Sequence, residues 1–410
     1  MPHTLALAVE IATTVLAVAG MLYFLAALVA ARFYIFSRRK ARARAAQLTA
    51  AGWSPGVSIL KSLKGLDAGM MDAFRSHARQ NYHGQFELLL GVSTLADPAV
   101  PAVELLQQEF PEIPIRLVEC PLRLGSNGKV STLVQLAEHA RHDFLLINDS
   151  DITVGPRYLE RVMAGFAPDE REASSHAPVG MVTALYRGRA HGSVFRDGLP
   201  SHLESLGIAT DFMPGVLMSR LIEGGLHYGL GSTLAVSRQA LDASGGLLPL
   251  VDQLADDHEL GARIDRAGYR VVLCPDVVET SVPAYGWRGF FDHQLRWLRT
   301  VRDARPGGYA GLVFTHGLGW ALLNAIASGV SPLSLWLLAL SFFLRLALAM
   351  TVGAEVLSDR QVLPHLWLLP ARDLVAMGLW IAGFAGNTIV WRGERFALRK
   401  GRLESRVHSS

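Results

Sequence analysis

An uninterrupted apolar run near the N-terminus is the feature that most constrains this chain. Residues 5–31 carry a single charged side chain, Glu10, and about 20 helical residues are enough to cross the hydrocarbon core of a bilayer. The run is therefore long enough to span a membrane. Because no small-residue cleavage site follows a short apolar stretch, we expect a retained anchor and not a cleaved signal peptide.

Basic residues follow this run at once, with no acid among them: Arg32, Arg38, Arg39, Lys40, Arg42 and Arg44. Positive charge beside a helix end favours the cytoplasmic side of the membrane. We therefore expect the N-terminus to lie outside and the chain after residue 32 to lie in the cytoplasm. The alternative is a solvated basic helix, which is disfavoured because the charges begin where the hydrophobic stretch ends.

The last third of the chain, residues 311–391, is apolar again. Candidate membrane segments lie at residues 311–328, 332–354 and 363–391, and the last of them can break at Pro370. Arg345, Arg372 and Asp373 lie inside these segments, where ionisable residues normally face protein, water or a partner. The tail, residues 392–410, is basic and so favours the cytoplasm, yet three crossings would place it outside. The sequence leaves the number of crossings open.

Composition agrees with a chain that lies partly in lipid and excludes other classes of protein. Half of the 410 residues are hydrophobic and 18% are charged, against about 25% in soluble domains. A net charge of +3 is too small to indicate a nucleic-acid partner. Two cysteines, Cys120 and Cys274, form neither a disulfide framework nor a thiolate metal site, which favours a reducing compartment.

Between residues 52 and 285 short apolar runs alternate with amphipathic stretches. Strands are predicted at 57–63, 86–93, 115–120 and 144–148, and helices at 71–80, 98–109 and 130–140. The second helix is expected to begin at Asp97-Pro98, a cap residue followed by a first-turn proline. This alternation predicts an α/β domain with a parallel, doubly wound sheet, in which ligands bind beyond the carboxyl ends of the strands.

Two carboxylates leave the strand predicted at 144–148. Asp149 and Asp151 flank Ser150, and carboxylates at this spacing can hold one cation. Oxygen ligands suit Mg²⁺ or Mn²⁺ carrying a substrate diphosphate. The alternative is that either aspartate only caps the turn toward Pro156.

A second acidic group begins a predicted helix that ends at Gly268. Asp256, Asp257 and Glu259 lie in its first turn, where acids serve as N-caps or favour the helix dipole. A carboxylate at this place can also accept the proton of an attacking hydroxyl. The pattern alone does not decide between capping and catalysis.

Residues 286–305 predict an amphipathic helix on the membrane surface, because aromatic and basic side chains alternate along it. Three of its residues, His293, Arg296 and Trp297, are candidates for a diphosphate or acceptor site. An arginine there can bind a leaving diphosphate, and a tryptophan can stack on a sugar. The interfacial and the catalytic interpretations are compatible.

Together these residues resemble the ceramide glucosyltransferase family, including its bacterial lipid-glycosyltransferase branch that serves hopanoid synthesis. The resemblance covers most of the chain, and residues 57–67 are similar to the opening strand and loop of the family. The other matching motifs are Asp97-Pro98-Ala99, the Gly-x-Asn-x-Lys segment at residues 125–129, Asp149-Ser150, Asp257, Arg296-Trp297 and Arg372-Asp373. Each motif is modest, but their order and spacing are specific.

Three positions depart from the family pattern. Thr94 stands where the family usually has an aspartate that helps to hold the nucleotide, so either Asp97 substitutes for it or the affinity for the donor is lower. His293 replaces the Gln or Arg that begins the last motif, and Thr132 replaces an Asn.

The resemblance implies an A-type glycosyltransferase fold and an inverting transfer from a UDP-sugar to a hydroxyl of a membrane lipid, either ceramide or a hopanoid-type polyol. It implies Asp257 as the base and a Mg²⁺ or Mn²⁺ ion on Asp149 and Asp151. The remaining implied donor-binding residues are Asp97, Lys129 and Ser150, with Lys129 and Arg296 as electrostatic helpers. We expect an integral protein of the bacterial inner membrane with a cytoplasmic catalytic domain.

Two other functions stay open. A processive polysaccharide synthase uses the same kind of domain, but it needs more membrane helices to form a channel. A membrane protein that binds a nucleotide without chemistry is favoured by Thr94 and disfavoured by the three aspartates Asp149, Asp151 and Asp257.

Overall fold

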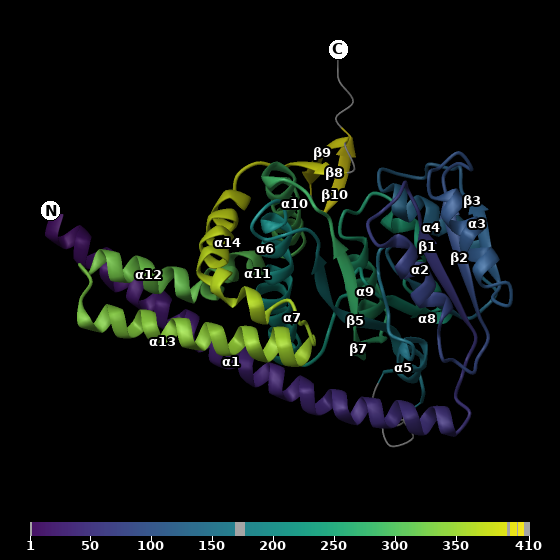
Figure 1. Cartoon of the computed structure of the whole chain (residues 1–410), viewed down its shortest axis with the longest axis horizontal. Coiled ribbons are helices and arrows are strands. Elements are labelled where there is room, and N and C mark those ends of the chain that lie inside the picture. Colours follow the sequence, from purple (N-terminus) through teal and green to yellow (C-terminus); the bar gives the residue numbers. More distant parts are fainter. Residues whose placement is uncertain (1, 169–176, 392–393, 400, 406–410) are drawn as a thin grey trace, which may run out of the picture.

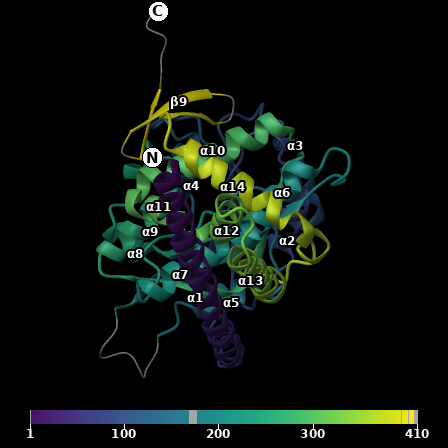
Figure 2. The same cartoon turned by 90° about the vertical axis from the view of Figure 1, so that its left-hand side faces the viewer.

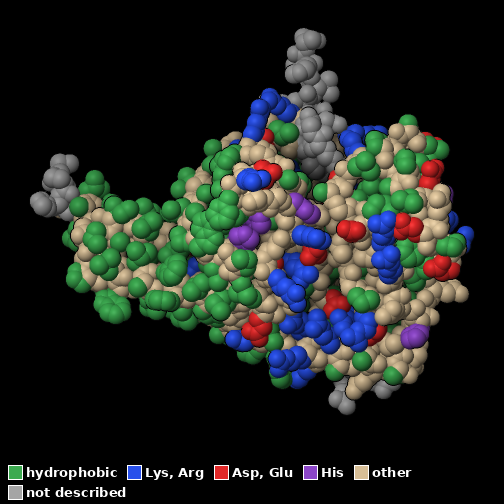
Figure 3. Space-filling model, in the orientation of Figure 1, with side chains coloured by type: hydrophobic (Ala, Val, Ile, Leu, Met, Phe, Trp, Pro, Cys, Tyr) green, Lys and Arg blue, Asp and Glu red, His purple; other side chains and the backbone are tan. Residues whose placement is uncertain are grey.

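The computed structural model describes residues 2–168, 177–391, 394–399 and 401–405. Figure 1 shows an elongated molecule, with an α/β domain at one end and a group of long helices at the other. Hydrophobic side chains cover the helical end in Figure 3, and Lys and Arg side chains gather beyond it. The two ends share one hydrophobic core, which includes Phe24, Ile59, Leu146 and Val352. The anchor and the α/β domain are therefore packed together.

The predicted anchor is the first part of a much longer helix, α1 (Pro2–Ala50). The basic stretch of this helix contacts the rest of the chain. Arg42 pairs with Asp276 at 3.2 Å, and the Arg38 guanidinium donates to the backbone oxygen of Val356. The basic residues follow the apolar run within the same helix, and they attach α1 to the rest of the chain.

The central sheet has seven strands in the order β3-β2-β1-β4-β6-β5-β7. Its strands are β1 (Val57–Ser62), β2 (Phe86–Val92), β3 (Ile115–Glu119), β4 (Phe144–Ile147), β5 (Val179–Ala190), β6 (Leu234–Ser237) and β7 (Arg270–Val282). The first four are parallel to one another, and each lies within one residue of its predicted bounds. The α/β class is confirmed.

The sheet is mixed and not wholly parallel, because β6 runs antiparallel to both β4 and β5. The helices between β5 and β6 pack at the edge where β5 ends, so the chain re-enters the sheet from that edge. A strand that returns from the same edge pairs antiparallel and needs no crossover. The sequence pattern does not show this reversal.

The helices that surround the sheet are short. They are α2 (Met70–Ala78), α3 (Val100–Glu109), α4 (Gly128–Glu138), α5 (Tyr158–Ala164), α6 (Leu199–Gly207), the π-helical η1 (Ile208–Phe212), α7 (Met213–Ile222), α8 (Arg238–Ala243), the 3-10 turn η2 (Leu248–Leu250) and α9 (Asp256–Arg266). The predicted interfacial helix is α10 (Trp287–Ala304). Its Trp287 and Phe291 are 46% and 41% exposed, whereas Phe290 is buried.

The C-terminal apolar third contains α11 (Pro306–Gly311), η3 (Leu312–Thr315), α12 (Gly317–Ala327), α13 (Pro332–Ala349), η4 (Met350–Val356), η5 (Leu363–Leu368) and α14 (Leu369–Gly383). Of the described residues, three helical stretches are long and apolar enough to cross a membrane: Thr4–Ala50, Pro332–Val356 and Leu363–Gly383. The bent pair Pro306–Thr315 and Gly317–Ala327 becomes a fourth if it is one span.

Helices α12 and α13 form a hairpin along α1. The Asn324 amide donates to the hydroxyls of Thr13 and Thr14, and Gly317 lies against Gly20 so closely that a Cβ on Gly20 would lie 2.2 Å from the Gly317 Cα. At the other end of the hairpin, Glu355 pairs with Arg32 at 2.9 Å. Helix α14 lies across this hairpin, since Figure 2 shows it lengthwise where α13 is seen end-on.

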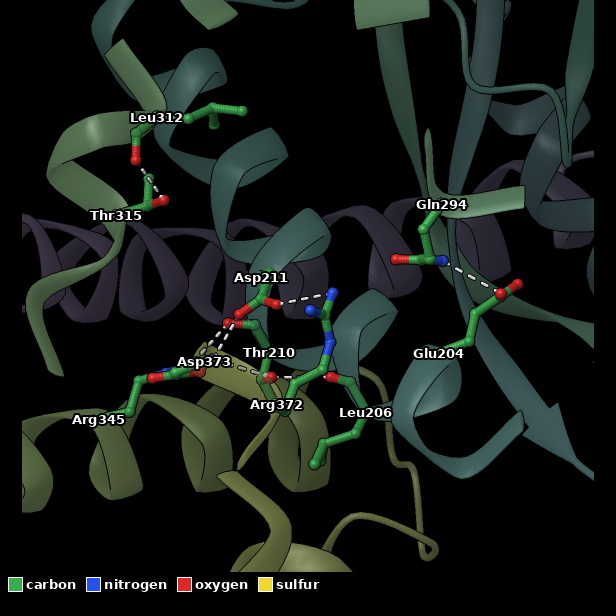
Figure 4. A network of polar contacts seen from close by, with 10 residues as sticks. All are labelled: Glu204, Leu206, Thr210, Asp211, Gln294, Leu312, Thr315, Arg345, Arg372 and Asp373. Carbon is green, nitrogen blue, oxygen red and sulfur yellow. Dashed lines mark hydrogen bonds and ion pairs between the residues drawn. The ribbon is translucent and has the colours of Figure 1, made fainter. Parts of the chain in front are cut away.

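The ionisable residues predicted at membrane depth are paired with one another, as Figure 4 shows. Arg345 is 2% exposed, and its guanidinium donates to Asp373 at 2.8 Å and to the backbone oxygen of Thr210 at 2.6 Å. It also contacts Asp211, whose other oxygen lies 3.0 Å from Arg372. Two cations and two anions thus join α13 and α14 to η1.

The region predicted as a basic tail is largely folded. Three antiparallel strands, β8 (Thr388–Trp391), β9 (Glu394–Arg399) and β10 (Arg402–Ser405), form a separate sheet. The last predicted apolar segment accordingly ends at Gly383 and not at Trp391. Of the basic residues assigned to the tail, Arg392, Lys400 and Arg406 lie outside the described residues.

Candidate active site

The predicted site residues at the end of β4 rest on a buried polar network. Asn148 is 1% exposed, and its amide donates to the backbone oxygen of Ser232 and to the Tyr158 hydroxyl. Its Oδ1 lies 3.2 Å from Nε2 of His77. Because the partners of Asn148 come from α2, α5 and the turn before β6, the chain leaves β4 in a fixed direction. Asp149 and Asp151 follow directly.

The structure brings Lys129 into the acidic group. Its Nζ lies 2.7 Å from Oδ1 of Asp149 and 3.5 Å from Oδ2 of Asp256. The lysine is in the first turn of α4, whose N-cap Asn127 accepts from the backbone of Val130. Burial opposes the charge on Lys129, but the carboxylates of Asp149 and Asp256 outweigh it and raise its pKa. Residues from three separate segments therefore meet at one charged centre.

Asp151 connects the end of β4 to β7. Its Oδ2 accepts from the Thr280 hydroxyl at 2.6 Å and from the Ser281 backbone at 3.0 Å. Burial, and then the neighbouring Asp149, raise the pKa of the Asp151 carboxyl. The capping alternative is not what the structure shows, because α5 begins at Tyr158 after Arg157, with no side-chain cap.

Ser150 lies between these two aspartates and is buried. Its hydroxyl donates to Oδ2 of Asp67, in the loop after β1. The structure thus gives Ser150 a role in joining two loops at the carboxyl edge of the sheet. Its predicted contact with the donor stays a prediction.

Asp257 is the second residue of α9, and Ala255 is the N-cap. The capping alternative is therefore not what the structure shows for Asp257 either. Its Oδ1 accepts from the backbone of His258 at 2.8 Å, and a Cβ on Gly231 would lie 2.9 Å from its Oδ2. Burial raises the pKa of Asp257, and Lys129 partly offsets this effect. Burial likewise raises the pKa of Asp256 to about 6, against the opposing charge of Lys129.

The Asp97 carboxylate accepts hydrogen bonds from the backbone around it. Its Oδ1 accepts from Gly65 and Ala99, each at 2.9 Å, and α3 begins at Val100, two residues later than predicted. The residue is 9% exposed. The structure thus shows Asp97 holding the loop after β1, while its predicted contact with the donor stays a prediction.

A pocket of about 280 Å³ lies beside Lys129, at the carboxyl ends of β1, β2 and β3. Ser62, Ser93, Ser131 and Thr132 line it with hydroxyls, and Phe396 contributes an aromatic ring. The volume is near the lower limit of about 300 Å³ for small-molecule sites. It suits one part of a nucleotide better than a whole nucleotide-sugar.

The candidates on α10 form a second group around a buried acid, Glu204. Nδ1 of His293 lies 3.0 Å from Oε2 of Glu204, and the Gln294 amide donates to the same oxygen at 3.1 Å. The Tyr285 hydroxyl also donates to it. Figure 4 shows the Glu204–Gln294 pair, apart from the charged network of Arg345. The Trp297 ring contacts that of His293 at a tilt, with ring centres 5.1 Å apart, and Arg296 precedes Trp297 on α10.

Tyr186 of β5 lies within electrostatic range of the acids of both groups. Its ring lies 5.9 Å from Phe212, which lies 5.9 Å from Trp297. Burial raises the pKa of Tyr186, and the carboxylates of Asp257 and Glu204 add to the effect. Acids of both groups therefore lie near this tyrosine.

Sequence reasoning missed Lys61, a fully buried lysine in β1. Its Nζ donates to the backbone oxygen of Asp149 at 2.9 Å. Burial lowers its pKa to about 7, while Asp151 and Asp149 favour its charged form. A lysine inside an apolar strand was the available signal, since buried charges are usually paired. Glu204 carried no comparable signal, because its neighbours in α6 do not mark it.

The acidic group fits a cation that arrives with its substrate. Among the described residues, no three His, Cys, Asp or Glu side chains form a metal cluster. Mg²⁺ is commonly held by one or two carboxylates together with substrate phosphates. The Asp149 side chain is 43% exposed and can receive such an ion, and the charge of Asp149 acts on the neighbouring Asp151 carboxyl.

Comparison with protein families places most of the chain in one of them. The family model described as Glycosyl transferase family 21 matches residues 13–404. Ceramide glucosyltransferase 3 of Caenorhabditis elegans is 22% identical over 362 residues, which are 85% of this chain and 73% of that protein. Ceramide glucosyltransferase 1 of the same organism is 22% identical over 361 residues, 85% of this chain and 72% of that protein.

Among solved structures, a mannosyltransferase from Pyrobaculum calidifontis in complex with GDP-Man and Mn²⁺ is similar. It is 17% identical with a TM-score of 0.46, and the alignment covers 90% of this chain and 97% of that one.

Proposed function

Because the chain belongs to glycosyl transferase family 21, we propose that it moves a hexose from a UDP-sugar to a hydroxyl of a membrane lipid, with inversion at the anomeric carbon. The observation that carries this proposal is the group of Asp149, Asp256 and Asp257 around Lys129, beside the pocket at the carboxyl ends of the strands. It is the place where an α/β sheet binds its ligands.

The chemistry is a single in-line displacement. The acceptor oxygen attacks the anomeric carbon, the bond from that carbon to the diphosphate oxygen breaks, and its electron pair leaves with UDP. The hydroxyl proton passes to Asp257, whose pKa is raised by burial. A raised pKa brings a carboxylate closer to the value at which a general base works best at neutral pH. An α-linked donor then yields a β-glycoside.

Charge that grows on the departing diphosphate needs positive partners nearby. Lys129 lies at the N-terminus of α4, and fixed cations aimed at developing charge are the strongest contributors in many enzymes. We assign Arg296 the same role from the α10 side. A Mg²⁺ or Mn²⁺ ion on Asp149 and Asp151 would neutralise diphosphate charge when bound.

The proposed acceptor is a lipid hydroxyl of the ceramide or hopanoid kind. The relatives are named ceramide glucosyltransferases, and the helical end of this chain exposes many large apolar side chains. We place the catalytic domain on the cytoplasmic face of a bacterial inner membrane, where UDP-sugars are made. Trp297 and His293 lie on α10, between that domain and the apolar helices.

The test is a donor panel. Membranes containing the protein are given radiolabelled UDP-sugars one at a time, and the extracted lipids are analysed by mass spectrometry. We expect one sugar on one lipid class, and none with Asp257→Asn. Label in a growing polymer would indicate a polysaccharide synthase, and no label with any donor would contradict the proposal.

A further inference from the structure

The C-terminal hairpin, here β9 and β10 with their described residues, packs against the segment that precedes the proposed base. Ile389, Phe396, Leu398 and Leu403 form a small hydrophobic core with Leu254. Leu254 lies three residues before Asp257. Among the described residues, Leu254 is the one member of this core from outside residues 388–405, and it lies in the loop that leads into α9.

Backbone hydrogen bonds make the attachment specific. The Leu254 amide donates to the Gly401 oxygen at 3.0 Å, and the Leu403 amide donates to the Asp252 oxygen at 2.8 Å. Gln253 and Arg402 form an antiparallel bridge between these bonds. Residues 252–254 are thus attached to β10 by a single bridge with a fixed register.

The same segment holds the loop before α4. The Asn127 backbone donates to the Val251 oxygen at 2.7 Å, and its side-chain amide donates to the Gln253 oxygen at 2.8 Å. The Ser126 amide donates to Oδ1 of Asp252. Residues 251–254 are therefore held between the hairpin and the loop that leads into α4, whose first turn contains Lys129.

Phe396 extends this contact into the pocket beside Lys129. Phe396 is the aromatic residue of the lining, which also includes Ser131 and Thr132. If Lys129 meets the diphosphate of a donor, the nucleobase can reach this pocket. A flat ring and hydroxyl groups suit the faces and the edges of a base, respectively.

We propose that the C-terminal hairpin forms the outer wall of the donor pocket, with Phe396 contacting the nucleobase of the donor, while its bonds to residues 252–254 position Asp256 and Asp257. This rests on the proposed nucleotide-sugar donor. Residues more than 250 positions after β2 thereby complete a site formed by the first three strands. In Figure 1 the hairpin lies between α10 and the part of the domain that contains α4.

The test compares two hairpin residues that share one core but differ at the pocket. Phe396→Ala and Phe396→Leu change the lining, whereas Leu398→Ala weakens the same core without touching the pocket. The full-length protein in detergent is titrated with UDP and, separately, with inorganic pyrophosphate. Melting temperatures are recorded for all variants.

We expect Phe396→Ala to raise the Kd for UDP about 5- to 150-fold, the effect of removing an aromatic ring from a base. Pyrophosphate affinity should stay within about twofold, because it has no base. Phe396→Leu keeps the core filled and should show the same selective loss of UDP affinity. It provides the test if Phe396→Ala fails to fold. Leu398→Ala should lower the melting temperature and leave UDP affinity within about twofold.

Unchanged UDP affinity in both Phe396 variants would overturn the proposal, and so would an equal loss in Leu398→Ala. In either case wild-type UDP binding would still support the donor assignment. A wild-type protein that does not bind UDP would instead contradict the donor, and the role of Phe396 with it.

Discussion

Nζ of Lys129 lies 2.7 Å from Oδ1 of Asp149, so the cation of the site is paired with the carboxylate that we expect to receive the metal ion. A bound diphosphate and its metal ion would give both residues new partners, because the ion would bind the carboxylate of Asp149 and the diphosphate would bind the ammonium of Lys129. In the protein alone, the ammonium of Lys129 offsets the charge of Asp149.

Lys129→Met should lower kcat by about 10²–10³-fold, the usual effect of removing one donor to developing negative charge. Lys129→Arg keeps the charge and should recover part of the rate. The measurement is donor turnover at saturating acceptor, with melting temperature as the control for folding. A methionine variant with a normal rate would exclude Lys129 from leaving-group stabilisation.

Asp257→Asn should reduce transfer by about 10²–10⁴-fold while UDP affinity and melting temperature stay near the wild-type values. Asparagine keeps an oxygen for the His258 amide but cannot take the proton. Asp256→Asn is the matched control and should lower the transfer rate less. Asp256 contacts Lys129 and Asn127, and it is not the proposed base. If Asp257→Asn transfers sugar at a normal rate, Asp256 and Glu259 become the next candidates for the base.

Transfer should depend on a divalent cation. EDTA should abolish it and Mg²⁺ or Mn²⁺ should restore it, because Asp149 and Asp151 offer the oxygen ligands these ions prefer. Asp151→Ala should raise the metal concentration needed for half-maximal rate. Full activity of the wild type in chelator would contradict the metal assignment.

Asp373→Asn should destabilise the protein by about 3–5 kcal/mol, since it leaves the buried Arg345 without its main partner. Replacing both residues, as in Arg345→Met with Asp373→Leu, should recover part of that loss. Arg32→Met is the control, because its pair with Glu355 is 64% and 42% exposed and is worth about 0–1 kcal/mol. Thermal unfolding in one detergent compares the three. Equal melting temperatures would contradict a structural role for the buried pair.

The family and the α/β class were predictable from the sequence, and the match over residues 13–404 confirms the family. Buried parallel strands read as continuous apolar runs, so β1, β2 and β4 were found within one residue. Strand β6 and its direction were not predicted, because its four residues pair with partners almost a hundred positions earlier and their pattern carries no direction.

The acidic half of the site followed from motif positions, but its attachments did not. The residues next to Lys61 and Glu204 in the sequence do not indicate which distant groups these two side chains contact. The hairpin was hidden for a different reason: Arg395, Arg399 and Arg402 dominate its composition. The spacing of two between Phe396 and Leu398, which puts both side chains on one face of a strand, was the available signal, and it was outweighed by the charge.

The hydrogen bond between Leu403 and Asp252 also constrains the membrane topology, because it decides whether the number of crossings after α10 is even or odd. A strand bonded to the catalytic domain must lie on the same side of the membrane as that domain, so the chain crosses an even number of times between α10 and β8. We propose that the α12–α13 hairpin, together with the bent segment before α12, supplies two crossings, outward beside Thr13 and back to Arg32. Helix α14, which lies across that hairpin, is then left at the membrane surface. Reporter fusions after residue 330 and after residue 405 should read opposite sides, and the second should match the catalytic domain.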